Sequence, residues 1–240
     1  MRFAYIIEPP FNDRTGSGAV FGHDADLARH IFFQLGEDFE PVETTFAKLL
    51  PGLEKGNWQM TTGLFATPER ARNAAFTRPV WALGDGLLVK RGNPLGLSGY
   101  RSTAKDDSAR LAVIRDQVQE RTARSFSMPP ELLFVYDTYD DAAEAVRDGD
   151  VDAYASVNQA HRGYIERTDA AHVETIAVPA EEVAPGMGSF ALRRSDRHLL
   201  TRVNEILDGY LGTAAHRDLA ARYGFTGDDL DLLLSRPGAT

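Results

Sequence analysis

The alternation of short apolar runs with helical spacings along residues 1–80 constrains the fold more than any other feature. Phe3 to Ile7 is an aromatic and β-branched run that ends at Glu8-Pro9-Pro10, which is typical of a strand entering a loop. Apolar residues at helical spacing come next: Leu27, Ala28, Ile31 and Leu35. Asp24 is a candidate cap for this helix and Gly36 is its predicted stop.

The same alternation continues through residue 80. Residues 39–42 and 58–62 are predicted strands, and Phe46, Leu49, Leu50 and Leu53 mark a helix between them. Thr67-Pro68-Glu69 predicts a further helix, because it offers a hydroxyl cap, a proline at the first position and a carboxylate at the positive end of the dipole. Strands that alternate with helices along the chain predict the α/β class with a largely parallel sheet.

A second α/β unit is expected after Gly92-Asn93-Pro94. Strands are predicted at 111–114, 133–136 and 151–156, and Thr138 with Asp141 resembles a capping box for a helix that stops at Gly149. A segment rich in proline, glycine and glutamate, 179–188, is predicted to be a linker.

The part of the chain after this segment is too short to form a domain. We therefore expect residues 1–90 plus 185–240 to form one lobe and 91–184 the other, joined by a two-strand hinge near 88–92 and 178–185. Residues 235–240 are expected to be disordered.

Composition excludes several functional classes. The net charge of −9 disfavours nucleic-acid binding, which needs a basic surface. The chain contains no cysteine, so it has no disulfide, thiol nucleophile or thiolate metal site. No apolar run approaches the roughly 18 residues of a membrane span. The start at Met1 does not resemble a signal peptide, so the protein is expected to be extracytoplasmic if a leader was removed and cytoplasmic otherwise.

Signatures of catalysis or of a bound cofactor or metal are missing from the sequence. There is no glycine-rich phosphate loop, no Gly-x-Ser-x-Gly elbow and no His-Glu-x-x-His motif. None of the six histidines forms a pair with metal-ligand spacing, so each is expected on the surface or in a loop. Adjacent carboxylates are expected to be caps or solvated charges: Asp106-Asp107, Asp140-Asp141, Glu181-Glu182 and Asp228-Asp229.

Several stretches, in the same order along the chain, resemble the polar amino-acid solute-binding proteins of ABC importers. They are Glu8-Pro9-Pro10-Phe11, residues 21–28, Leu49-Leu50-Pro51-Gly52-Leu53, Thr67-Pro68-Glu69-Arg70, residues 75–79, residues 149–153 and Tyr223-Gly224-Phe225. Within that family the chain looks closest to the ectoine and hydroxyectoine binders, through residues 45–79, 211–213 and 224–225. The resemblance implies a two-lobed periplasmic-binding-protein-like fold that closes on a ligand by hinge motion.

The resemblance also implies ligand-binding residues. Arg70 matches the family arginine that binds a ligand carboxylate, and its guanidinium offers two parallel donors suited to that group. An alternative is that Arg70 lies on a surface helix and pairs with Glu69 or Asp85. Phe11 and Phe65 match two aromatic residues of the ectoine binders.

Glu8 matches the acid of the ectoine binders, and Phe46 matches a third aromatic residue. Aromatic faces and a carboxylate suit a delocalised cation. Core packing is the alternative for Phe46, because it lies on the apolar stripe of its predicted helix, and Glu8 could instead be exposed to solvent.

The second lobe departs from the usual amino-acid binders. Arg115-Asp116-Gln117-Val118 stands where many of them have Gly-Thr, and Ser156, Val157 and Asn158 stand where most carry an aspartate for the ligand ammonium. A cyclic or N-substituted amino acid therefore fits better than a standard one, unless Asp116 supplies the missing charge. The helix start at Gln117 could offer backbone amides to a carboxylate, and Asn158 is the remaining polar candidate.

The sequence therefore predicts a binding protein, not an enzyme, for a small zwitterionic amino-acid-like ligand, acting as a monomer with an ABC permease. The sequence leaves two alternatives open. One is an enzyme resembling cyclohexadienyl dehydratase, in which Arg70 binds the substrate and Glu8 or Asp116 is the acid or base. The other is a cytosolic sensor module without a transporter.

Overall fold

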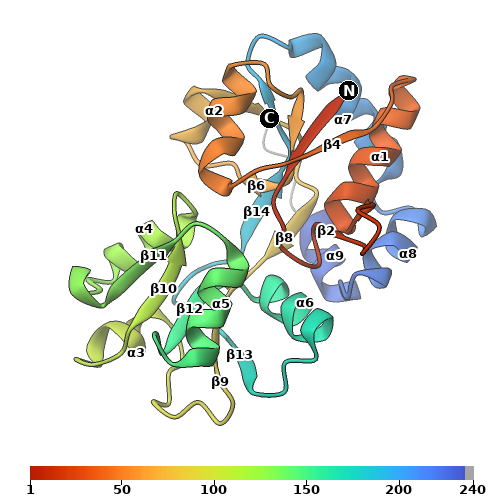
Figure 1. The fold of residues 1–240 in the computed structure, drawn as a ribbon. Helices are drawn as coiled ribbons and strands as arrows, with labels where there is room; N and C mark the ends of the chain where they lie inside the picture. The colour runs from red at the N-terminus through yellow and green to blue at the C-terminus, as the bar shows by residue number, and fades with distance from the viewer. Residues whose placement is uncertain (236–240) are drawn as a thin grey trace. The chain divides into compact units, whose positions relative to one another are not determined.

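The computed structural model describes residues 1–235 and divides the chain into two compact units (Figure 1). The first comprises Met1–Ala82 and the described residues from Gly186 onward, and the second comprises Leu83–Pro185. The two-lobed α/β class predicted from the sequence is confirmed. The prediction of disorder at 236–240 lies outside the described residues.

The first unit is built on a five-stranded sheet in the order β4-β1-β5-β15-β7. β1 pairs in parallel with β4 and β5, whereas β15 is antiparallel to β5 and β7, so the sheet is mixed. A smaller sheet runs in the order β6-β14-β8, and β2 pairs with β3. The elements of this unit are β1 (Arg2–Tyr5), β2 (Asp13–Arg14), β3 (Val20–Phe21), α1 (His23–Leu35), β4 (Glu40–Glu43), η1 (Phe46–Lys48), α2 (Leu49–Glu54), β5 (Met60–Thr61), β6 (Leu64–Phe65), η2 (Arg70–Arg72), β7 (Ala74–Phe76), β8 (Trp81–Leu83, across the boundary), β14 (Gly186–Ser189), β15 (Ala191–Arg193), α7 (Arg197–Tyr210), α8 (Ala214–Arg222) and α9 (Gly227–Ser235).

The second unit also has a mixed five-stranded sheet, in the order β11-β10-β12-β9-β13. β10 is parallel to β11 and β12, and β9 is antiparallel to β12 and β13. All four residues of β10 and all five of β12 are buried, as expected for strands covered on both faces. The elements are β9 (Asp85–Lys90), α3 (Tyr100–Lys105), β10 (Leu111–Ile114), α4 (Val118–Ser125), η3 (Pro130–Leu132), β11 (Leu133–Tyr136), α5 (Tyr139–Asp148), β12 (Ala153–Val157), α6 (Asn158–Thr168) and β13 (Val173–Ala177).

Local sequence signals explain where several helices begin and end. α1 ends at Gly36, whose left-handed backbone (φ 75°) lets its N–H reach carbonyls of the last turn. The hydroxyl of Thr138 accepts a hydrogen bond from the backbone N–H of Asp141, so the predicted cap of α5 is confirmed. In Figure 1, α1 and α7 lie side by side although they come from opposite ends of the chain, and the two helices are in contact.

Three local predictions need correction. Thr67 does accept a hydrogen bond from the N–H of Arg70, but only one 3-10 turn, η2, follows before β7 pairs with β15. Asp24 does not cap α1, because the cap residue is Gly22 and the Asp24 side chain points inward, fully buried. The predicted linker ends in a strand, β14, whose Gly188 pairs with Phe65 of β6.

Candidate functional site

Three aromatic side chains of the first unit pack in a row, which we call the aromatic group: Phe11, Trp81 and Phe65. The ring centroids of Phe11 and Trp81 are 5.4 Å apart, and those of Phe65 and Trp81 are 5.3 Å apart. Two glycines of β14 make room for these rings. A Cβ at Gly186 would lie 2.5 Å from the Phe65 ring, and one at Gly188 would lie 2.1 Å from the Trp81 ring.

Arg70 adjoins this aromatic group. Its side chain is buried, with 6% of the residue exposed, and its Nη1 donates a hydrogen bond to the carbonyl oxygen of Phe65 at 3.0 Å. Its Cζ lies 5.1 Å from the centroid of the Phe46 ring, which is a cation–π distance. The surface position that the alternative gave to Arg70 is therefore wrong. Phe46 is half-buried and also packs against the hydrophobic core of the unit, so its two interpretations are compatible.

Glu8 belongs to the turn that carries Phe11. Its backbone N–H donates to the carbonyl of Asn12, and its carbonyl accepts from the N–H groups of Phe11 and Asn12. The residue is buried, with 9% exposed, so the alternative of a solvent-exposed Glu8 is wrong. The structure thus brings five predicted residues into one connected region of the first unit: Glu8, Phe11, Phe46, Phe65 and Arg70.

The three predicted residues of the second unit lie at starts of helices. Asp116 is exposed with φ 64°, Gln117 is the buried N-cap residue of α4, and Asn158 is the first residue of α6. α4 follows β10 and α6 follows β12, and these strands are parallel neighbours. The three residues therefore share the carboxyl edge of the sheet, where ligands of open α/β sheets bind.

Asp85 lies at the same edge, opposite Val157 in the ladder of β9 and β12. It accepts hydrogen bonds from the Tyr100 hydroxyl and from Nε2 of Gln119, each at 2.7 Å. Burial raises the pKa of Asp85, and these two hydrogen bonds counteract part of the rise. Asp85 thereby ties α3 and α4 to the sheet.

The prediction that each histidine lies on the surface or in a loop is wrong for His23, His161 and His216, which are fully buried on helices. His161 lies within hydrogen-bonding distance of the Tyr139 hydroxyl and of the Gly86 carbonyl. Burial lowers the pKa of His161 to about 3 and that of His216 to about 4, so both rings are neutral at pH 7. Neutral imidazole is amphipathic enough to be buried, which spacing along the sequence does not reveal.

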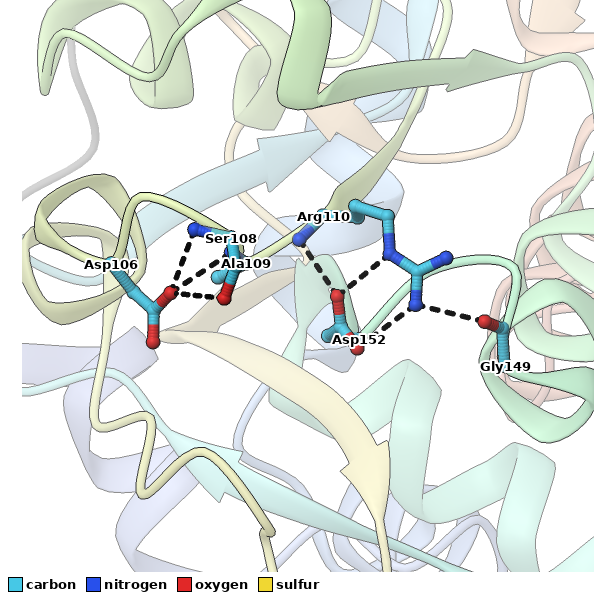
Figure 2. A network of polar contacts seen from close by, with 6 residues as sticks. All are labelled: Asp106, Ser108, Ala109, Arg110, Gly149 and Asp152. Atoms are coloured by element: carbon cyan, nitrogen blue, oxygen red, sulfur yellow. Dashed lines mark hydrogen bonds and ion pairs between the residues drawn. The ribbon is translucent and has the colours of Figure 1, made fainter.

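A small cavity of about 150 Å³ lies at the opposite edge of the second sheet, next to the network that Figure 2 shows. Arg110 binds Asp152 with Nε at 2.9 Å and Nη2 at 3.1 Å, and Nη2 also donates to the Gly149 carbonyl. Burial alone would raise the pKa of Asp152, but the hydrogen bonds from Arg110 outweigh it and lower the pKa. This network fixes the amino ends of β10 and β12. Asp106 accepts from Ser108 and Ala109 in the adjacent turn (Figure 2), as predicted for a capping carboxylate.

Within residues 1–235, no group of three or more histidine, aspartate or glutamate side chains could hold a metal ion. Within the same range, no helix has the length and apolar character needed to cross a bilayer.

Comparison with known proteins identifies the family. Residues 2–225 match the bacterial extracellular solute-binding proteins, family 3. The chain belongs to this family. It is therefore a solute-binding protein, and the role predicted from its sequence is confirmed.

Named relatives of this family 3 protein are binding proteins of ABC transporters. A probable amino-acid ABC transporter periplasmic-binding protein of Sinorhizobium fredii is 28% identical over 92% of this chain and 77% of its own length. The ABC transporter arginine-binding protein 1 of Escherichia coli is 23% identical over 83% of this chain and 79% of its own.

Among solved structures, EhuB in complex with hydroxyectoine superposes with a TM-score of 0.89 and 26% identity, covering 98% of this chain and 91% of EhuB. The predicted resemblance to ectoine binders is confirmed. An ancestral amino-acid-binding protein, a precursor of cyclohexadienyl dehydratase, has a TM-score of 0.81 and 24% identity over 93% of this chain and 94% of its own, and it shares the fold alone. The relatives thus support the binding role and not the dehydratase alternative.

Trp81 is the member of the aromatic group that sequence reasoning missed. The signal lies in Gly186-Met187-Gly188, at the end of the predicted linker. Glycines alternating along a strand are typical of places where bulky rings approach the backbone.

Proposed function

We propose that this protein binds a small zwitterion with a carboxylate at one end and a delocalised or substituted cation at the other, and delivers it to an ABC permease. The observation that carries the proposal is the continuous row from Phe11 through Trp81 and Phe65 to the buried guanidinium of Arg70. Aromatic faces attract a cation, and a guanidinium pairs with a carboxylate through parallel hydrogen bonds. Such a row suits a ligand that carries both groups.

In this proposal Arg70 holds the carboxylate and Glu8 neutralises the cationic end. Phe11, Phe46, Phe65 and Trp81 provide apolar walls. That Asp116, Gln117 and Asn158, at the starts of α4 and α6 in the second unit, also contact the ligand stays a prediction of the sequence. Closure of the protein on its ligand stays a prediction of the sequence, as does its monomeric state.

The names of the relatives supply two ligands to test first. EhuB was solved with hydroxyectoine, and several curated relatives are arginine-binding proteins. Hydroxyectoine carries an amidinium-type ring and arginine a guanidinium, so both combine a delocalised cation with a carboxylate. We also propose that binding is the whole activity, with no turnover of the ligand.

The test is thermal unfolding of the purified protein against a panel of ligands. The panel contains arginine, hydroxyectoine, ectoine, proline, glycine betaine, the other proteinogenic amino acids and prephenate. A ligand present at about one hundred times its Kd stabilises the folded state by about 2.7 kcal/mol, which raises Tm measurably. A rise with a zwitterion that bears a delocalised or substituted cation supports the proposal. A rise with prephenate alone, together with its conversion to phenylpyruvate, contradicts it.

A further inference from the structure

The buried carboxylate of Asp24 lies next to the aromatic group, although nothing in the binding scheme above uses it. Asp24 is the second residue of α1, and its side chain is fully buried. Its Oδ2 accepts hydrogen bonds from the Thr62 hydroxyl at 2.7 Å and from the Gly63 N–H at 2.8 Å, and its Oδ1 lies 3.0 Å from Nδ1 of His23. Both oxygens are thus engaged, which compensates for the cost of burying the group.

One side of this network leads to the turn that carries Glu8 and Phe11. The Thr62 hydroxyl that donates to Asp24 also accepts a hydrogen bond from Nδ2 of Asn12 at 2.8 Å. The backbone N–H of Asp24 donates to the carbonyl of Phe11 at 3.0 Å. Asp24 therefore contacts the turn in two ways. Its backbone N–H binds Phe11 directly, and its carboxylate is linked to Asn12 through the Thr62 hydroxyl.

The other side of the network leads to Trp81 and Phe65. A Cβ built on Gly63 would lie 2.7 Å from Nε1 of Trp81 and 3.0 Å from Oδ2 of Asp24, so both groups approach the same glycine. Gly63 directly precedes β6, which contains Phe65. Asp24 therefore fixes the segment from which Phe65 projects and the glycine against which Trp81 packs.

We propose that Asp24 is a positioning residue for ligand binding: its carboxylate sets the separation and orientation of Phe11, Phe65 and Trp81. The proposal rests on the proposed function, because it assumes that these rings contact the ligand. Rigid support of a binding surface lowers the cost of ordering it when the ligand arrives. Loosening the network is expected to raise Kd by about tenfold or more even when the protein remains folded.

The experiment uses Trp81 as its own reporter. The chain has two tryptophans, so Trp58→Phe leaves Trp81 as the only one. In this background, Thr62→Val removes both hydrogen bonds of the bridging hydroxyl at nearly constant side-chain shape, and Asp24→Ala removes the carboxylate itself. Thr77→Val is the matched control, because Thr77 is also buried in the first unit and also makes two hydrogen bonds, to the Arg78 carbonyl and from the Phe190 N–H.

Two quantities are measured at a temperature where every variant is folded. The first is the emission maximum and acrylamide quenching of Trp81, which is 5% exposed in the structure, without ligand. The second is Kd for arginine and hydroxyectoine by calorimetry. We expect Thr62→Val and Asp24→Ala to red-shift the emission, increase quenching and raise Kd, whereas Thr77→Val lowers Tm to a similar extent and leaves both quantities unchanged.

Unchanged emission and unchanged Kd in Thr62→Val, with a loss of Tm like that of Thr77→Val, would overturn the proposal by showing a purely structural role. If neither ligand binds the Trp58→Phe parent, the choice of ligand is wrong, and the Trp81 emission alone tests the positioning role of Asp24. A red shift of the emission maximum in Thr62→Val and Asp24→Ala, but not in Thr77→Val, supports that role. An unchanged emission maximum in Thr62→Val and Asp24→Ala overturns it.

Discussion

Replacing His216 by asparagine is expected to reduce the stability that the protein loses between pH 7 and pH 5 by about 2 kcal/mol. His216 is fully buried, its Nδ1 accepts a hydrogen bond from the Gly212 N–H, and its Nε2 has no hydrogen-bond partner within residues 1–235. Burial first, and then the nearby His23 and Arg217, lower its pKa to about 4, against about 6.5 for a histidine in an unfolded chain. The unfolded state therefore binds the proton first as the pH falls.

The magnitude follows from this difference in pKa. Stability from the neutral His216 is present above pH about 6.5 and is lost as the pH falls toward 4. Each pH unit in that window costs about 1.4 kcal/mol, so lowering the pH from 7 to 5 costs about 2 kcal/mol from this residue alone. In the His216→Asn variant this contribution is absent, while the asparagine carbonyl can still accept the hydrogen bond from Gly212.

The assay is urea unfolding at pH 7 and pH 5 for the wild type, His216→Asn and His198→Asn. His198 is exposed on α7 and serves as the control. The fall in the free energy of unfolding between the two pH values should be smaller by about 2 kcal/mol in His216→Asn and unchanged in His198→Asn. An equal fall in all three proteins would refute the assignment of a buried, neutral His216.

Two further predictions concern one residue in each unit. In the second unit, Asp85→Asn should keep nearly wild-type stability. Its amide oxygen can accept one of the two hydrogen bonds, and its NH2 group can donate to the other partner, either the Tyr100 hydroxyl oxygen or Oε1 of a flipped Gln119. Asp85→Ala should lose about 2–4 kcal/mol by leaving two buried donors unpaired, and equal urea midpoints for the two variants would argue against this. In the first unit, Gly188→Ala in the Trp58→Phe background should displace Trp81 and change its emission, because the new Cβ would lie 2.1 Å from the ring. Gly209→Ala in α7 meets no atom within 4 Å, so the same measurement in the same background should show unchanged emission.

Sequence patterns predicted the fold well wherever local chemistry decides the outcome. The apolar stripe of α1, the left-handed Gly36 that ends it and the hydroxyl cap of α5 each depend on residues close together in the chain. The prediction of a helix after Thr67-Pro68-Glu69 was wrong, although these residues have the chemistry of a helix start. Pairing of β7 with β15, more than 100 residues away, competes there with helix propagation and leaves a single turn.

The candidate site was only partly predictable for a similar reason. Resemblance to the family indicated Arg70 and three phenylalanines, but not that Trp81 lies between Phe11 and Phe65. The Trp81 ring packs directly against Gly188, which is distant from it in the sequence, so residues near position 81 do not reveal this contact. The burial of Asp24 likewise depends on Thr62 and Gly63, which no spacing around residue 24 reveals.

The central claim is that Arg70 binds the carboxylate of a zwitterionic ligand, and calorimetric titration of a matched pair of variants tests it most directly. Arg70 and Arg72 belong to the same 3-10 turn, but Arg70 is buried beside Phe65 and Arg72 is exposed. Arginine and hydroxyectoine are titrated into the wild type, Arg70→Ala and Arg72→Ala. We predict that Arg70→Ala loses at least about 2 kcal/mol of binding free energy, a rise in Kd of about 30-fold, and that Arg72→Ala binds like the wild type. If neither ligand binds the wild type, the same pair of variants is titrated with the zwitterion that raises Tm in the ligand panel. Equal affinities of Arg70→Ala and the wild type for the bound zwitterion would contradict the account.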